Sequence, residues 1–325
     1  MKQAKSSLLV NFGGPRSLEE VQPFLRSLLT DQEVIRTDWP AFLHRLLFNR
    51  VADKRAKTVR HDYAAIGGKS PIYEDTEALA RALEEELGHP VLSFHRYLPA
   101  THEEFLQRLA ALPGEIEVFP LFPQFSYATT GSIALWFHEK AAPDIVQRMR
   151  WVPSYASHPL YIAAFKETIR TFLHEKQIPE EEALLFFSAH GLPQSFITTG
   201  DIYQRECEAT YNALKSAFPH ASSLIAYQSQ FGKEEWLRPY TRDACEEVTQ
   251  YGKQHVIFIP LSFTSDHIET LFEIEEMYLP VVANQGIKAW RCPALNRRPD
   301  WIRAMAGIIR EERHRSSTAM LMRHK

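Results

Sequence analysis

Residues 183–193, ALLFFSAHGLP, decide the fold of the second half of the chain. The apolar run that opens this stretch does not alternate with polar residues, which is typical of a strand buried on both faces of a parallel sheet. An amphipathic stretch follows at 202–218, and a second β-rich run follows at 223–228. This order of strand, helix and strand predicts a βαβ unit.

The same alternation occurs along the whole chain, in two series. Strands are expected at 8–12, 91–97, 116–122, 150–153, 183–188, 223–228, 256–261 and 289–292. Helices are expected at 18–29, 75–87, 103–111, 132–149, 159–176, 202–218, 239–251, 268–278 and 301–313. The pattern predicts an α/β protein with two parallel sheets, an N-terminal domain at 1–155 and a C-terminal domain at 156–300. A helix and tail at 301–325 fit either half and can pack back on the first.

Composition excludes several classes of protein. The chain has 325 residues, 45% of them hydrophobic, which suffices for two globular domains. The net charge is −3 and no basic block is present, so nucleic acid is not an expected partner. Neither a run of 18 apolar residues nor an export signal occurs, which predicts a cytoplasmic protein. Cys207, Cys245 and Cys292 form no CxxC pair and are expected to be buried thiols.

Ligands of open α/β sheets lie outside the carboxyl ends of the strands. The segments at those ends are 11–15 (NFGGP), 123–132 (PQFSYATTGS), 188–193 (SAHGLP), 228–232 (QSQFG) and 262–269 (SFTSDHIE). Neither the GxGxxG of a dinucleotide site nor the GxxxxGK[ST] of a P-loop is present, so no nucleotide is expected. These loops should converge on one site.

The segment between Lys253 and Lys288 contains no Lys or Arg but several acids. In an α-helix, Asp266, Glu269, Glu273 and Glu276 would lie on one face, with Glu275 on the opposite side. One interpretation is a solvated acidic face near a helix N-terminus. The other is a path for a divalent metal, because carboxylate and imidazole ligands without thiolate suit transient handling of such an ion.

His190 also allows two interpretations. A histidine at the end of a strand is often a structural residue that is satisfied by hydrogen bonds. The rigid Gly191-Leu192-Pro193 turn and an ordinary imidazole pKa of about 6.5 instead favour a proton acceptor that works near neutral pH.

Together these motifs resemble the ferrochelatase family over nearly the whole chain. The resembling segments are LLVNFGGP (8–15), IGGKSPIY (66–73), FPQFSYATTGS (122–132), FFSAHGLP (186–193), GDIYQRE (200–206), YQSQFGKEEWLRP (227–239) and PLSFTSDHIETLFEIE (260–275). The resemblance implies a fold like that of the class II chelatases. In it, two Rossmann-like domains, each with a four-stranded parallel sheet, flank an active-site cleft. It also implies insertion of Fe2+ into a porphyrin.

The resemblance assigns roles residue by residue. His190 and Glu269 match the catalytic and metal-binding pair, and Asp266, His267 and Glu273 match a polar path for protons or metal. Residues matching the porphyrin site are Phe12, Arg96, Tyr97, Ser126, Thr129, Thr130, Tyr203, Trp236 and Phe263. For the aromatic residues of this set, and for Tyr97 above all, core packing is the alternative.

Substrate and cofactors follow from the same resemblance. Arg16 after NFGGP stands where the coproporphyrin branch tends to carry Tyr, so protoporphyrin IX is the expected substrate, with protohaem as product. The alternatives are coproporphyrin III, a cobalt or nickel chelatase of another tetrapyrrole, and a non-catalytic porphyrin or haem carrier. The tail that ends Met322-Arg323-His324-Lys325 carries no cysteine cluster, so no [2Fe-2S] centre is expected.

Residues 39–48 combine apolar and basic side chains at helical spacing. Such a stripe is ordinarily core. The family uses this region as a hydrophobic lip, which implies peripheral contact with the inner membrane through an exposed amphipathic helix. A monomer is expected.

Overall fold

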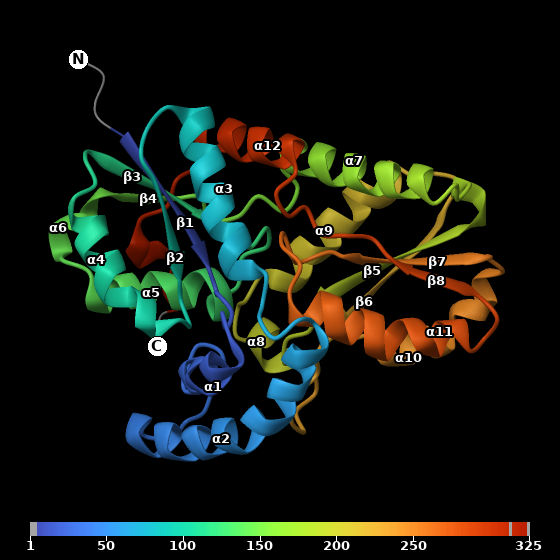
Figure 1. Ribbon diagram of the computed structural model, residues 1–325, viewed down its shortest axis with the longest axis horizontal. Coiled ribbons are helices and arrows are strands. Elements are labelled where there is room, and N and C mark those ends of the chain that lie inside the picture. The colour runs from blue at the N-terminus through green and yellow to red at the C-terminus, as the bar shows by residue number, and fades with distance from the viewer. Residues whose placement is uncertain (1–4, 312–313, 324–325) are drawn as a thin grey trace. The chain divides into compact units, whose positions relative to one another are not determined.

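The computed structural model describes residues 5–311 and 314–323 (Figure 1). Contacts divide the chain into two compact units, Met1–Ser154 with Met305–Lys325, and Tyr155–Ala304. Each unit has one four-stranded parallel sheet with flanking helices, which confirms the predicted fold class.

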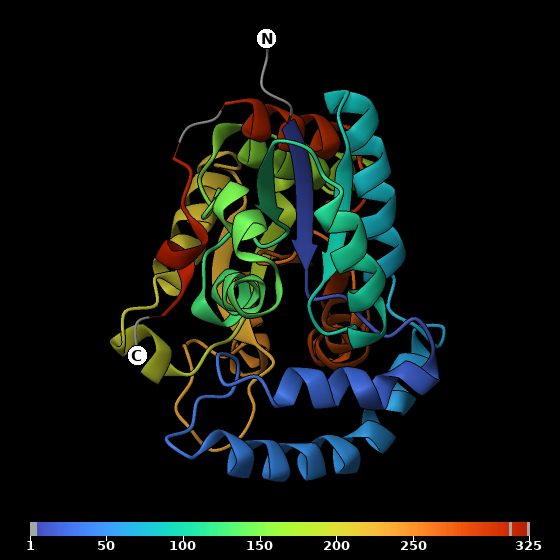
Figure 2. The same ribbon diagram turned by 90° about the vertical axis from the view of Figure 1, so that its left-hand side faces the viewer.

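The sheet of the first unit has the order β2-β1-β3-β4. Its strands are β1 (Lys5–Asn11), β2 (Val91–His95), β3 (Glu115–Pro120) and β4 (Met149–Trp151). Its helices are η1 (Leu18–Glu20), α1 (Val21–Leu29), α2 (Ala41–Ala65), α3 (Ile72–Leu87), η2 (Pro99–Thr101), α4 (His102–Ala110), the π-helix η3 (Tyr127–Gly131), α5 (Ser132–Lys140), α6 (Pro143–Arg148) and η7 (Thr318–Leu321). Figure 2 shows α1 and α2 side by side, with α2 on the outside of this unit.

The sheet of the second unit has the order β6-β5-β7-β8. Its strands are β5 (Ala183–His190), β6 (Ser222–Gln228), β7 (His255–Pro260) and β8 (Lys288–Arg291). Its helices are α7 (Pro159–Glu175), η4 (Glu180–Glu182), α8 (Gln194–Thr198), α9 (Tyr203–Ser216), α10 (Thr241–Glu246), η5 (Val248–Tyr251), the π-helix η6 (Glu269–Tyr278) and α11 (Leu279–Ala283). Helix α12 (Pro299–Arg310) continues from this unit into the first.

Strand β5 is buried on both faces. Phe186 of β5 packs with Phe258 of β7 in a core cluster that also contains side chains of α10, η6 and α11. Phe187, which points to the opposite face, contacts Tyr211 of α9 with ring centroids 5.4 Å apart. Apolar residues are therefore required at successive positions, which explains the absence of alternation.

Strand order reverses at β1 and β3 in one sheet, and at β5 and β7 in the other. At such switch points the loops that follow the two central strands run in opposite directions and leave room for a ligand. His190 is the last residue of β5, and Glu269 is the first residue of η6, which follows the loop after β7.

All eight predicted strands are present, and the differences concern helices. The expected helix at 132–149 is divided into α5 and α6, because Pro143 cannot continue a helix and instead opens the next one. The expected α-helix at 268–278 is a π-helix. Helix α2, 25 residues long, was not predicted beyond its apolar start. Helix α12 ends at Arg310, and the predicted end at Arg313 lies outside the described residues.

Candidate active site

Hydrogen bonds fix the backbone of His190 at the end of β5. Its amide N donates to Ser262 Oγ at 2.9 Å, and Tyr203 Oη donates to its carbonyl oxygen at 2.9 Å. The next amide, of Gly191, donates to the carbonyl oxygen of Gln228 at 2.8 Å. The loop after β5 is thus tied to β6, to α9 and to the loop after β7, so the position of the imidazole is defined from three sides.

Gly191 makes this close approach possible. A Cβ at this position would lie 2.7 Å from the carbonyl oxygen of Gln228 and 3.1 Å from Cε3 of Trp236. Because the first neighbour is backbone, only glycine fits here without a shift of β5 against β6. Trp236 is buried against this turn, so it supports the histidine loop from behind.

The side chain of His190 contacts one of two neighbouring carboxylates, that of Glu269. Its Nδ1 lies 2.7 Å from Glu269 Oε2. Ser229 Oγ lies within hydrogen-bond distance of both Glu269 Oε2, at 3.2 Å, and Glu273 Oε2, at 2.6 Å. Gln228 Nε2 donates to Glu273 Oε2 at 3.0 Å. His190 and the two glutamates therefore form one hydrogen-bonded cluster in the second unit.

Two members of this cluster were not singled out in the sequence. Gln228 is buried and also bonds Ser188 Oγ at 2.6 Å and the carbonyl oxygen of Glu269 at 3.0 Å. Ser229 has a φ of 64°, an uncommon conformation for a residue other than glycine. Such strain concentrates at functional sites. Gln228 ends β6 and Ser229 follows it, and this position at the end of a strand was the available signal.

The π-helix η6 explains which acids converge. In a π-helix the hydrogen bond runs from residue i+5 to residue i, as from the Leu279 amide to the Ile274 carbonyl oxygen. Glu269 and Glu273 both reach Ser229, whereas Glu276 is exposed. The predicted single face of four acids, which assumed α-helical spacing, is therefore wrong.

Asp266 lies in a different network. Its carboxylate accepts hydrogen bonds from Arg291 Nη1 at 2.8 Å, Asn296 Nδ2 at 2.7 Å and Thr270 Oγ1 at 2.9 Å. Arg291 Nε also pairs with Glu275 at 2.6 Å. The acidic segment lacks local cations in sequence, but β8 supplies one in space. Asp266 therefore anchors the start of η6 and does not join the carboxylate pair.

Charge coupling sets the protonation of the cluster. Burial acts to lower the pKa of His190, but the charge and hydrogen bond of Glu269 and the charge of Glu273 outweigh it, so the pKa is raised. Burial opposes ionisation of Glu269, but the imidazolium of His190 dominates and lowers the pKa of that carboxyl to about 2. Burial and the nearby charge of Glu269 raise the pKa of Glu273 to about 7. Near neutral pH the cluster can thus both hold and release a proton.

His267 lies at the edge of the same cluster. Its Nε2 is 4.0 Å from Glu269 Oε1, and its ring centroid is 4.5 Å from that of Phe263. Burial lowers the pKa of His267, so its imidazole is neutral at pH 7. Its buried Nδ1 has no hydrogen-bond partner among the described residues. Phe263 also contacts His190 edge-on, with centroids 6.4 Å apart, and is partly exposed beside the imidazole.

Several residues that the resemblance assigned to the porphyrin are buried. In the first unit Tyr97 is fully buried and donates to Asp31 Oδ2 at 3.0 Å, and Arg96 Nη2 donates to the same oxygen at 2.7 Å. Ser126 and Thr130 are also buried. In the second unit Tyr203 and Trp236 are buried, and they hold the loop of His190. Tyr97 is fully buried with its hydroxyl bonded to Asp31, as the core-packing alternative expects, and Thr130 is fully buried as well.

Three assigned residues of the first unit remain partly exposed: Phe12, Arg96 and Thr129. Phe12 follows β1 and packs against Phe122, which follows β3, with ring centroids 4.9 Å apart. This aromatic pair therefore lies at the switch point of the first sheet.

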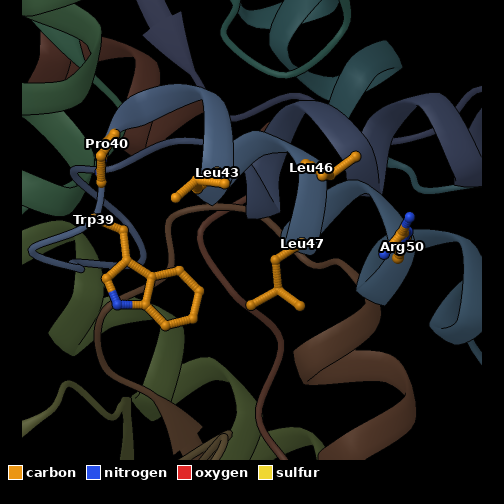
Figure 3. A pocket seen from close by; sticks show the side chains of 6 residues that line it. All are labelled: Trp39, Pro40, Leu43, Leu46, Leu47 and Arg50. Carbon is orange, nitrogen blue, oxygen red and sulfur yellow. The ribbon is translucent and has the colours of Figure 1, made fainter.

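The apolar start of α2 is exposed. The exposed fractions lie between 38% and 69% for five side chains, here called the α2 apolar face: Trp39, Phe42, Leu43, Leu46 and Leu47. A pocket of about 340 Å³ is lined by Trp39, Pro40, Leu43, Leu46, Leu47 and Arg50 (Figure 3). The interpretation of this stripe as core is therefore wrong, and only His44 within it is buried.

Residues 5–311 and 314–323 contain neither a membrane-spanning helix nor a cluster of three metal-ligating side chains. No helix there combines the length and apolar character needed to cross a bilayer. No group of three or more His, Cys, Asp or Glu side chains there is arranged to hold a metal ion. The three cysteines are buried free thiols, as predicted, and burial raises the pKa of Cys245 to about 12.

Solved structures with a similar fold include CbiX and SirB. CbiX, titled the terminal enzyme for biosynthesis of sirohaem in denitrifying bacteria, aligns over 95% of this chain and 99% of its own, with a TM-score of 0.53 and 14% identity. SirB from Bacillus subtilis with Fe3+ aligns over 95% and 96%, also with a TM-score of 0.53 and 14% identity. At this identity the likeness shows the fold alone.

Sequence comparison gives the family. Residues 5–313 match the profile of the Ferrochelatase family. A ferrochelatase from Chlamydia abortus is 43% identical over 309 residues, which cover 94% of this chain and 96% of that protein. One from Chlamydia muridarum is 40% identical over 318 residues, covering 98% of each. The chain therefore belongs to the ferrochelatase family of metal-chelating lyases.

Proposed function

We propose that the protein inserts Fe2+ into protoporphyrin IX, and that His190, Glu269 and Glu273 carry out the exchange of two protons for the metal. The observation that carries this proposal is the continuous hydrogen-bonded cluster from His190 Nδ1 through Glu269 to Ser229 and Glu273. It joins a partly exposed imidazole to two carboxylates whose pKa values are driven apart, which is a common sign of acid and base roles.

The reaction requires charge balance. A neutral porphyrin has two N–H groups, so binding Fe2+ to its four nitrogens releases two protons. Neutral His190 accepts one proton through its ring nitrogen, and Glu269 stabilises the imidazolium that forms. The Glu273 carboxylate, hydrogen-bonded to Ser229 and Gln228, accepts the second and passes it to solvent. The same carboxylates attract the incoming cation, because each proton that the cluster releases to solvent makes its net charge more negative by one unit.

The choice of protoporphyrin IX is supported by Arg16 at the position after NFGGP. The Arg16 side chain pairs with Glu20 and lies over the ring of Tyr73 at 5.2 Å, so its place in the first unit is fixed. An anaerobic assay with Fe2+ and either protoporphyrin IX or coproporphyrin III, followed by absorbance, tests the proposal. Faster turnover of coproporphyrin III would contradict the substrate, and faster insertion of Co2+ or Ni2+ would contradict the metal. Binding of porphyrin without insertion would indicate a carrier.

The pH dependence of insertion should report both titrating groups. We expect kcat/KM for Fe2+ to rise with pH, because His190, whose pKa is raised by Glu269, must be neutral to accept a proton, and Glu273, whose pKa is raised to about 7, must be ionised to attract the cation. In Glu273→Gln, the limiting slope of log(kcat/KM) against pH below the inflection should fall from about two to about one. A slope that Glu273→Gln leaves unchanged would remove Glu273 from the mechanism.

We further propose that the protein works as a monomer in the cytoplasm without an iron–sulfur cluster or a nucleotide. Cys207, Cys245 and Cys292 lie in α9, in α10 and after β8, and burial raises the pKa of each thiol. The thiolates that ligate a cluster are therefore disfavoured at these positions. An absorbance spectrum of an anaerobic preparation tests for the iron–sulfur cluster. The molar mass from light scattering tests for the monomer.

The α2 apolar face supports a proposal of peripheral membrane contact. Its exposed aromatic and leucine side chains stand beside Arg45 and Arg50, a combination typical of helices that lie in an anionic membrane surface. An apolar substrate would be delivered from such a surface.

Replacement of the two most exposed side chains of this face should release the protein from vesicles. We expect Phe42→Ser with Leu46→Ser to weaken binding to vesicles with anionic lipid at least about tenfold, because two large apolar side chains lose their burial in lipid. Met320→Ser, at a 70% exposed methionine of η7, is the control and should not weaken binding. Equal effects of both changes, measured by co-sedimentation, would exclude α2 as the contact.

A further inference from the structure

The segment 314–323 supplies counter-ions to two buried carboxylates of the first unit. Arg315 Nε donates to Glu117 Oε2 of β3 at 2.5 Å, and both residues are nearly buried. Arg323 Nε and Nη2 donate to the two carboxylate oxygens of Glu33 at 3.0 and 3.3 Å. These two hydrogen bonds form a fork, in which one guanidinium holds both oxygens of one carboxylate. Glu33 is only 3% exposed, so loss of this fork would leave a buried charge without its cation.

Glu33 lies in the segment 30–40, which connects α1 to α2. The neighbouring Asp31 is also held by a cation, because Arg96 Nη2 donates to its carboxylate at 2.7 Å. The two acids are linked, since the Glu33 amide donates to Asp31 Oδ1 at 2.9 Å. Segment 30–40 is thus fixed by two ion pairs, one from the end of β2 and one from Arg323.

The start of α2 depends on this segment. Gln32 Nε2 donates to the carbonyl oxygen of Trp39 at 3.4 Å, and Thr37 Oγ1 lies 2.9 Å from Nδ1 of the buried His44. Trp39 is the first side chain of the α2 apolar face, and the other four follow within two turns. A shift of segment 30–40 would therefore move the α2 apolar face.

We propose that Arg323 is a positioning residue for substrate uptake: its fork onto Glu33 fixes segment 30–40 and so holds the α2 apolar face in the orientation that receives the porphyrin. The pair joins residues 290 positions apart, and no contact of Arg323 with substrate is implied. The inference rests on the proposed function for its kinetic consequence. Its structural consequence can be measured independently.

The test uses the full chain with Arg323→Gln, which keeps most of the side-chain length but removes the charge. We expect amide hydrogen exchange at Glu33, Val34 and Ile35 to accelerate about tenfold, as expected for loss of a charged hydrogen bond. With porphyrin supplied in anionic vesicles, KM for porphyrin should rise about tenfold. The kcat should change by less than about twofold, because the cluster of His190 lies in the other unit.

Variants that restore the Arg323→Gln protein show whether Arg323 positions segment 30–40 or only stabilises the fold. In Glu33→Gln with Arg323→Gln, no buried charge remains unpaired, so exchange and KM should return most of the way to wild type. Arg323→Lys should rescue in part, because an ammonium cannot form the two parallel hydrogen bonds of a guanidinium. The matched control is Arg310→Gln, which breaks an exposed pair with Glu86 and should change neither quantity.

Three results would overturn the inference: unchanged exchange across 30–40, exchange that accelerates equally throughout the unit, or faster local exchange with unchanged KM. If the wild-type protein inserts no metal, the proposed function fails instead, and the exchange data still decide whether Arg323 holds the segment.

Discussion

His190→Ala should lose metal insertion by a factor of about 10² to 10⁴ while it still binds porphyrin. The imidazole is the only ring nitrogen base hydrogen-bonded to Glu269 among the described residues, and alanine leaves no imidazole to take the first proton. The measurement is initial rate of haem formation with Fe2+ under anaerobic conditions, with porphyrin affinity from fluorescence quenching. If His190→Ala keeps its affinity for porphyrin, the lost activity reflects loss of the proton acceptor and not loss of the porphyrin site.

Alanine also removes the partner of Glu269, so a second variant is needed. His190→Gln can still hydrogen-bond Glu269 but cannot accept a proton, and it should be as inactive as His190→Ala. His174→Ala, at an exposed histidine of α7, is the control and should have wild-type activity. Turnover by His190→Gln near the wild-type rate would show that His190 has a structural role, as a histidine at the end of a strand often does.

Glu269→Gln should reduce turnover by at least about 10²-fold with little loss of fold. Glutamine keeps the size of the side chain but removes the charge that raises the pKa of His190 and attracts the cation. We expect the apparent KM for Fe2+ to rise, and thermal unfolding to shift little, because Ser229 can still bond the amide. Rates at several Fe2+ concentrations and a melting curve give both quantities.

Glu276→Gln is the control for this variant. Glu276 lies in the same π-helix but is exposed, and surface substitutions usually change stability by less than about 0.5 kcal/mol. Glu275, which the helical wheel placed away from the other four acids, is a poorer control because it pairs with Arg291, which also holds Asp266. Similar small effects at Glu269, Glu273 and Glu276 would support the solvated acidic face instead.

The strands and the order of elements could be read from the sequence because they depend on local patterns. Phe186 and Phe187 must both be apolar, since each faces a different layer of helices, and this requirement is visible in an unbroken run. His190 and Glu269 could be proposed for a similar reason. Parallel strands end at the same edge of a sheet, so residues after β5 and β7 meet wherever those strands pair.

The tertiary structure decided which charges face one another. Asp266 and Glu273 are both acids in a segment without Lys or Arg, yet Asp266 meets Arg291 of β8 and Glu273 meets Glu269 through Ser229. The turn of the π-helix and the register of β7 with β8 determine this, and neither follows from an α-helical wheel.

The sequence alone determined the two sheets, the loops that carry the chemistry and the family resemblance, because these depend on neighbours in the chain and on motifs that persist in it. Only the tertiary structure showed that Tyr97 is buried, that the α2 apolar face is exposed and that Arg323 holds Glu33. Burial and ion pairing depend on residues up to 290 positions away, and no local pattern specifies such partners.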